Sequence, residues 1–154
     1  MADVLTHEWA AEVATAIQNG PSPEYKATKL DKYWDWVEMT GGGFTASIAI
    51  GVSDPPASAD GSWLVIDFAD GTCTGARIGD EGDAQAATFR LRATAADLDE
   101  LLDGYDVGKA LMYRKLQLLE APPEKIHEFF RTIYFLKESL GLLANTGRPM
   151  ASAS

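Results

Sequence analysis

The stretch that decides the fold runs from residue 89 to residue 143 and reads FRLRATAADLDELLDGYDVGKALMYRKLQLLEAPPEKIHEFFRTIYFLKESLGLL. Its apolar residues recur first with the period of two of a strand and then with helical spacing. The same order, strand spacing followed by helical spacing, is then repeated. The predicted elements are a strand over 87–93, a helix capped by Thr94 and ended by Gly104, a short helix capped by Asp106, a strand over 115–120, and a helix from Pro122-Pro123-Glu124 to Gly141. This stretch holds a large apolar surface and no convincing set of catalytic side chains.

Upstream of this stretch, the pattern predicts one helix, an ambiguous segment and three strands. Thr6 is a suitable N-cap for a helix that Gly20 and Pro21 end. A helix is favoured from about residue 24 to 33, whereas residues 33–39 either continue it or form a short strand. The remaining predictions are a flexible joint at 41–43, strands over 44–52, 62–69 and 72–78, a hairpin turn at Asp70-Gly71, and a polar loop over 79–85. This order predicts an α+β fold in which helices pack on one face of a curved sheet.

Length and composition predict one globular domain. The chain has 154 residues and a net charge of −10, which argues against a nucleic-acid partner because phosphates would repel it. We expect a single domain over 1–145 and a flexible polar tail over 146–154. The chain has no apolar run of 18 residues, no recognisable secretory signal and one cysteine, Cys73. These features predict a cytoplasmic protein without a membrane-spanning segment.

The charge is distributed unevenly along the chain. Residues 1–106 carry 6 basic and 19 acidic side chains, whereas residues 107–154 carry 7 basic and 4 acidic ones. One interpretation is a solvated acidic surface with lysines near helix ends. The other is that the basic part faces an anionic group on a ligand or a partner. The candidates for contacting a carboxylate or phosphate, if they are not simply exposed to solvent, are Lys109, Arg114, Lys115 and Lys137.

Three stretches resemble the sterol carrier protein type 2 family. They are the aromatic strand and acidic-Gly turn WLVIDFADG (63–71), the helix DLDELLDG (97–104) followed by KALM (109–112), and the strand KLQL (115–118). The sequence departs from the family at Arg114 and at residues 120–122, where the family commonly has glycine, and its region 24–43 is unusually long. The resemblance implies a five-stranded mixed sheet covered by helices, with an apolar tunnel between the two layers. It further implies a ligand such as a fatty acid, an acyl-CoA ester, a sterol or a phospholipid.

The residues themselves leave open whether the apolar side chains enclose a cavity or a solid core, and the resemblance favours a cavity. The predicted ligand-contacting residues are Ile48, Ile50, Trp63, Val65, Phe89, Leu91, Leu98, Leu101, Leu102, Leu111, Met112, Leu116, Phe129, Ile133 and Leu136. We therefore expect a protein that binds and carries a hydrophobic small molecule without transforming it. An accessory subunit of a metabolic enzyme, with a collapsed or adapted tunnel, is the alternative, and an enzyme acting on an acyl or aromatic substrate is a third. A homodimer or an enzyme partner is possible in either of the first two cases.

Evidence for catalysis or for a cofactor is weak in the sequence. His7 and His127 lie on separate predicted helices without a second histidine at ligand spacing, so no metal site is predicted. Cys73 has no neighbouring base in the sequence, so we do not expect a nucleophile. The aromatic run Tyr33-Trp34-Asp35-Trp36 has two interpretations: it caps a cavity or stacks on a ligand, or it packs an N-terminal helix onto the sheet.

Overall fold

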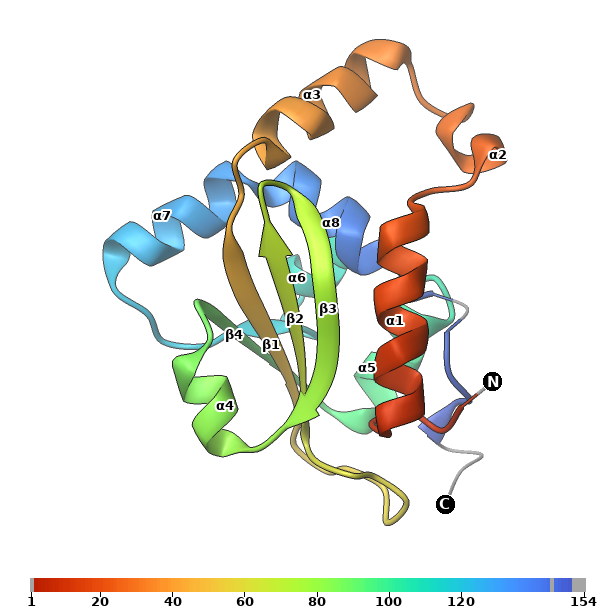
Figure 1. Cartoon of the computed structure of the whole chain (residues 1–154), viewed down its shortest axis with the longest axis vertical. Coiled ribbons are helices and arrows are strands. Elements are labelled where there is room, and N and C mark those ends of the chain that lie inside the picture. Colours follow the sequence, from red (N-terminus) through yellow and green to blue (C-terminus); the bar gives the residue numbers. More distant parts are fainter. Residues whose placement is uncertain (1, 145, 151–154) are drawn as a thin grey trace.

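A computed structural model describes residues 2–144 and 146–150, which form an α+β fold built on one mixed sheet (Figure 1). The helices are α1 (His7–Asn19), α2 (Pro23–Lys26), α3 (Asp31–Gly41), α4 (Glu81–Ala86), α5 (Ala95–Leu102), α6 (Val107–Met112), α7 (Pro123–Arg131) and α8 (Ile133–Gly141). The strands are β1 (Ala46–Val52), β2 (Trp63–Ala69), β3 (Thr72–Gly79), β4 (Phe89–Ala93) and β5 (Gln117–Leu118). The predicted fold class and five-stranded sheet are confirmed.

The strands are ordered β3-β2-β1-β4-β5 across the sheet. Pairing is antiparallel throughout except between the central strands β1 and β4, which are parallel. In this register Ile48 lies beside Ile66 on β2 and beside Phe89 on β4, so these three side chains share one face of the sheet. Ala49, Trp63 and Val65 on the opposite face are buried as well, but the face that holds Ile48 is the one turned toward most of the helices.

Most helices pack on that face and bury its apolar side chains in one continuous core. Helix α1 lies along β3, and its Trp9, Val13 and Ile17 are buried. The predicted N-caps are confirmed: Thr6, Thr94 and Asp106 each accept a hydrogen bond from a backbone N–H of the first turn of α1, α5 and α6.

The segment 79–85, predicted to be a polar loop, instead contains helix α4. Asp80 and Asp83 form a capping box in which each side chain accepts a hydrogen bond from the other's backbone N–H. The helix buries Ala84 against Trp63 and Val65 on the second face of the sheet. The prediction failed because a short helix with Gly82 and few apolar residues has almost no helical periodicity.

The final helix, predicted to be continuous, is divided at Thr132 into α7 and α8. Thr132 is buried, and its hydroxyl donates to the carbonyls of Glu128 and Phe129 at 3.0 and 3.2 Å. Such side-chain bonds compete with the helix ladder and bend it. The preceding strand is also shorter than predicted, because β5 covers only Gln117–Leu118 of the expected 115–120.

Residues 21–43 form an arm that projects from the end of the sheet and contains α2 and α3 (Figure 1). The predicted helix over 24–33 is wrong, because α2 ends at Lys26 and Leu30 has extended backbone before α3 begins. The segment 33–39, which the sequence left open, is helical. Gly41, predicted to belong to a flexible joint, is the buried last residue of α3.

The C-terminal prediction also needs correction. Residues 146–150 were expected to begin a flexible polar tail, yet they pack against the N-terminal part of the domain. The Trp9 indole N–H donates to the Thr146 hydroxyl at 3.0 Å, and the Met150 N–H donates to Asp99 at 2.8 Å. Residues 151–154 of the predicted tail lie outside the described residues.

Candidate functional site

Most of the predicted tunnel residues form a packed core between the sheet and the helices. Each of the following is at most 7% exposed: Ile48, Ile50, Phe89, Leu91, Leu98, Leu102, Leu116, Phe129 and Leu136. Aromatic rings fill much of this space: Phe89 lies 5.4 Å from Phe129 and 6.4 Å from Phe44 between ring centroids. Close packing of this kind is typical of a solid protein interior, although Leu116 also reaches the wall of an open cleft described below.

Two predicted residues lie on the other face of the sheet. Trp63 and Val65 alternate with Leu64 and Ile66 along β2, so they point away from the main helical layer and pack against α4. The Trp63 indole N–H donates to Glu81 at 2.9 Å. Trp63 and Val65 therefore cannot line the same cavity as Ile48 and Ile50.

The remaining predicted residues lie beside open clefts. Met112 is 72% exposed, because α6 turns Val107 and Ala110 inward and leaves its last residue outside. Leu101 lines one cleft beside the arm. Leu111, Met112, Leu116 and Ile133 line another.

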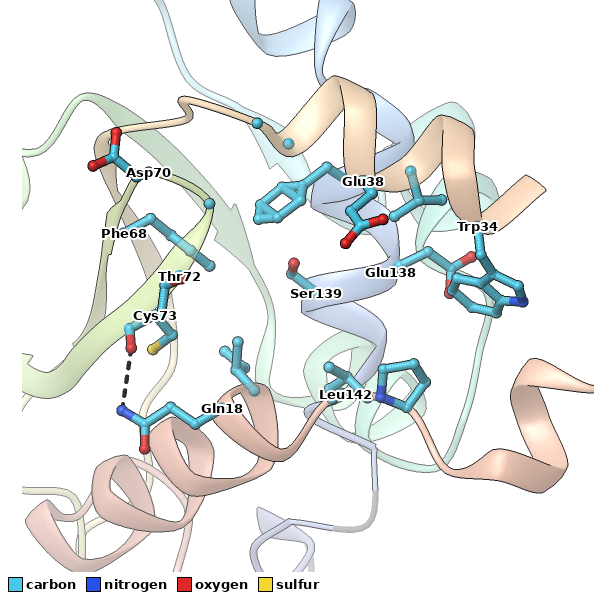
Figure 2. A pocket seen from close by; sticks show the side chains of 18 of the residues that line it. Gln18, Trp34, Glu38, Phe68, Asp70, Thr72, Cys73, Glu138, Ser139 and Leu142 are labelled. Carbon is cyan, nitrogen blue, oxygen red and sulfur yellow. Dashed lines mark hydrogen bonds between the residues drawn. The ribbon is translucent and has the colours of Figure 1, made fainter. Parts of the chain in front are cut away.

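One hollow, which we call the α3 groove, lies between the arm, α8, the end of α1 and the β2–β3 turn (Figure 2). Its volume is about 480 Å³. Apolar side chains from four elements surround it: Ile17 of α1, Val37 of α3, Phe68 of β2, and Phe135 and Leu142 from α8 and its C-cap. None of these five residues was predicted as a ligand contact, because they belong to segments far apart in the sequence.

Close backbone packing brings the walls of the groove together. A side-chain carbon added at Gly41 would lie 2.1 Å from Cδ1 of Phe135, so α3 meets α8 closely only because residue 41 is glycine. A carbon added at Gly71 would lie 2.7 Å from the Gly41 carbonyl oxygen. On the opposite side, the Gln18 amide donates to the Cys73 carbonyl at 3.1 Å and ties α1 to β3 (Figure 2).

The aromatic run of the arm packs it onto helix α8, and not onto the sheet. Tyr33 makes edge-to-face contacts with Trp34 and Tyr134 at centroid separations of 5.1 and 6.2 Å. Trp34 also lines the groove, and its indole N–H donates to the Lys26 carbonyl at 2.9 Å. Thus the run fixes the arm, and one of its rings borders the hollow.

Glu138 of α8 accepts hydrogen bonds from two hydroxyls of the arm. The Tyr25 hydroxyl donates to it at 2.9 Å, and the Tyr33 hydroxyl donates to its other oxygen. Burial and then these hydrogen bonds raise the pKa of Tyr25 to about 12 and raise that of Tyr33 as well. Both tyrosines therefore stay neutral donors at physiological pH, and the carboxylate between them is held in place.

A second hollow of about 410 Å³ continues from the α3 groove. The two share Pro21, Glu138 and Leu142, and the second extends to Leu101 and Tyr105 beside α5. Leu142 is only partly buried and contributes to both hollows.

A separate cleft, which we call the edge cleft, lies between α6, β5, α7 and α8 and measures about 580 Å³. Its walls are Leu111, Met112, Leu116, Leu118, Phe130 and Ile133, with Gly108, Arg114 and Gln117 beside them. Arg114 has φ = 61°, in the left-handed region that disfavours side chains. Of the four basic residues considered as head-group partners, Arg114 lines this cleft, whereas Lys115 is bound to Glu100 at 3.0 Å.

Cys73 borders the α3 groove but is buried, and burial raises the pKa of its thiol. A thiol that stays protonated is a poor nucleophile. Among residues 2–144 and 146–150, no three His, Cys, Asp or Glu side chains converge to hold a metal ion. No helix in the described part of the chain is long and apolar enough to cross a bilayer.

Comparisons with known proteins define the class of fold. No family model and no curated sequence matches the chain. The crystal structure of sterol carrier protein 2 superposes with a TM-score of 0.68 at 20% identity, covering 94% of this chain and all of that one. The solution structure of a conserved hypothetical protein from Thermus thermophilus, described as possibly a sterol carrier protein, gives 0.60 at 19% identity, with 97% and 94% covered. The chain therefore has the sterol carrier protein fold over nearly its whole length.

Proposed function

We propose that this protein binds and carries a hydrophobic small molecule without transforming it, and that the molecule occupies the α3 groove. The observation that carries the proposal is a hollow of about 480 Å³ with apolar walls from four elements, in a chain with the sterol carrier protein fold. Small-molecule sites are typically concave, mostly apolar and ~300–1,000 Å³ in volume. A buried, protonated Cys73 supports a binding role over a catalytic one.

The size of the groove bounds the affinity. A ligand that buries about ten methylene groups would gain about 8 kcal/mol at ~0.8 kcal/mol each. Association and ordering would cost ~4–15 kcal/mol against this gain. The net gain is therefore at most about 4 kcal/mol, and we expect dissociation constants of about 1 mM or weaker, as suits a carrier that must release its cargo. The free Cys73 thiol favours a reducing compartment such as the cytoplasm as the place where this happens.

The test compares two matched substitutions: Leu142→Trp, which narrows the α3 groove and the second hollow that continues from it, and Leu111→Trp in the edge cleft. Both residues are partly buried leucines, so the two variants carry the same chemical change in different hollows. Uptake of the neutral dye Nile red is measured by fluorescence, and co-purifying molecules are identified by native mass spectrometry after organic extraction. We expect Leu142→Trp to reduce dye binding at least tenfold and Leu111→Trp to leave it within twofold.

The reverse pattern would move the site to the edge cleft, and absence of uptake by the unmodified protein would refute the carrier function. Thermal unfolding of both variants must stay cooperative for the comparison to hold. A parallel loss of binding in both variants, with both folded, would contradict a site confined to the α3 groove.

A second candidate function is an accessory role through the outer face of the arm. Leu30, Trp36 and Met39 are 79%, 48% and 61% exposed, so this segment presents three large apolar side chains to solvent within ten residues. A second copy of this chain or an enzyme partner would cover them. Sedimentation analysis of the unmodified protein and of Trp36→Ser/Met39→Ser tests the homodimer: a dimer that the double variant abolishes supports it, and a monomer at all concentrations contradicts it.

A further inference from the structure

The charged side chains around the α3 groove are predominantly acidic. The lining includes Glu38 from α3, Asp70 from the β2–β3 turn and Glu138 from α8, against the single base Lys26 from α2. Figure 2 shows Glu38 and Asp70 on opposite sides of the hollow, with the Asp70 carboxylate directed outward at the rim and Glu138 beside Trp34. The polar end of a ligand that enters the groove is therefore exposed to a negative electrostatic potential from these carboxylates.

The acidic groups differ in how they are compensated. Glu138 is held by the hydroxyls of Tyr25 and Tyr33. Within the described residues, no hydrogen bond or ion pair engages the carboxylates of Glu38 and Asp70. These two exposed carboxylates therefore leave uncompensated negative charge at the rim of the groove, which the polar end of an entering ligand would pass.

The nearby lysines are directed at aromatic faces. The Lys26 ammonium lies 5.7 Å from the Trp34 ring centroid, and the Lys137 ammonium lies 5.9 and 5.7 Å from the rings of Tyr33 and Tyr134. Cation–π contacts of this kind hold the ammonium groups against the arm. Lys137 does not line the α3 groove at all, so only Lys26 opposes the three carboxylates there.

We infer that the α3 groove takes apolar molecules whose polar end is uncharged or cationic and excludes molecules that end in a carboxylate or a phosphate. This inference rests on the proposed function and specifies its ligand class. An anionic head group would meet net repulsion from the rim, whereas a hydroxyl would not and an ammonium would be attracted. The edge cleft offers the opposite environment, because its one charged lining residue is Arg114.

The experiment uses three ligands with the same ten-carbon chain and different ends: decanoate, decanol and decylamine. Binding to the full chain is measured at pH 7.5 by displacement of Nile red, at 10 mM and at 1 M NaCl. At low salt we expect decanol and decylamine to bind at least about tenfold more tightly than decanoate, as two unscreened carboxylates would produce. At 1 M salt the difference between decanol and decanoate should shrink to about twofold, because the Debye length falls to ~3 Å.

The variant Glu38→Gln/Asp70→Asn removes both free charges and keeps the side-chain shapes. Asparagine tolerates the positive φ of 51° at position 70. We expect decanoate binding to strengthen about tenfold at low salt. Decylamine binding should weaken, and decanol binding should stay within twofold. The control Glu8→Gln/Asp103→Asn makes the same change in net charge at exposed positions that do not line the groove, and should leave all three affinities unchanged.

The outcomes separate the inference from the proposed function. If the unmodified protein takes up no Nile red, the carrier function fails and the inference fails with it. If the dye binds and none of the three ligands displaces it, the carrier function stands and the inference is overturned. If all three bind equally and all are blocked by Leu142→Trp, the carrier function stands and the charge inference is overturned. If decanoate binds but is blocked by Leu111→Trp and not by Leu142→Trp, the anion occupies the edge cleft, and its exclusion from the α3 groove is supported.

Discussion

Gly41→Ala tests whether the contact between α3 and α8 is as tight as the structure indicates. The new methyl carbon would lie 2.1 Å from Cδ1 and 2.7 Å from Cε1 and Cγ of Phe135. The ring has little room to retreat, because it packs on Phe44 and Phe68 with centroid separations of 5.5 and 5.6 Å. Either the ring or the arm must shift.

The magnitude follows from two opposing contributions. Overpacking of a well-packed site costs about 1–3 kcal/mol. Replacing glycine by alanine in a helix returns about 0.5–1 kcal/mol. We therefore expect Gly41→Ala to lower the free energy of unfolding by about 1–2 kcal/mol and the midpoint of thermal unfolding by about 2–8 °C. Because Phe135 lines the α3 groove, dye uptake should fall too.

Gly141→Ala is the matched control, since Gly141 is also the last residue of a helix but has open space where a side-chain carbon would be added. This variant should be more stable than the unmodified protein by up to about 1 kcal/mol. In the double variant Gly41→Ala/Phe135→Leu, the smaller side chain should relieve the clash and give a coupling energy of about 1 kcal/mol. Equal stability of Gly41→Ala and the unmodified protein, with no coupling to Phe135, would refute this account of how the arm is seated.

Two further predictions concern backbone strain and ionisation. Arg114→Gly should raise the free energy of unfolding by about 0.5–1 kcal/mol in denaturant titrations, because glycine adopts φ = 61° without a steric penalty, and a loss of stability would contradict strain at this residue. Glu138→Gln should return the pKa values of Tyr25 and Tyr33 toward 10, as followed by absorbance at 295 nm in an alkaline titration. Since burial and the Glu138 contacts raise the folded-state pKa values, both tyrosines stay protonated in the folded protein after they have ionised in the unfolded chain. The unmodified protein should therefore lose stability from pH 10 to about 12, and a flat profile there would contradict the raised pKa values.

Local signals in the sequence predicted the sheet and most helix starts. Alternation in β1 placed Ile48 and Ile50 correctly on one face, whereas Trp63 and Val65 of β2 were assigned to the same cavity although Leu64 and Ile66 occupy that face. Thr6 and Asp106 were recognised as caps from their side chains alone. Helix α4 was missed, although the Asp80–Asp83 spacing was a usable capping signal. These successes and failures concern interactions within a few residues of each other, which the sequence displays directly.

The candidate site could not be predicted in the same way. An apolar stripe predicts that a face is buried, but it does not reveal whether another side chain or an empty space lies opposite. Phe89 and Phe129 were predicted as a tunnel wall, and in the structure each fills the space in front of the other. The α3 groove depends on residue pairs such as Gly41 and Phe135, which are almost a hundred positions apart, and no local pattern marks such a pair.

The arm explains why open apolar surface occurs beside the sheet and not beneath the helices. Between the sheet and α7, the rings of Phe44, Phe89 and Phe129 form an unbroken series of contacts that closes the interior. Next to it, residues 21–43 leave the sheet and return to it, and α3 contacts α8 through the Tyr33–Glu138 bond at one end and the Gly41–Phe135 contact at the other. Helix α3 is thus held at its two ends, and the space between the helix and the end of the sheet stays open. The α3 groove occupies this space. The sequence feature that builds the site is therefore the long segment before β1, and changes in this segment should alter ligand choice while the sheet remains intact.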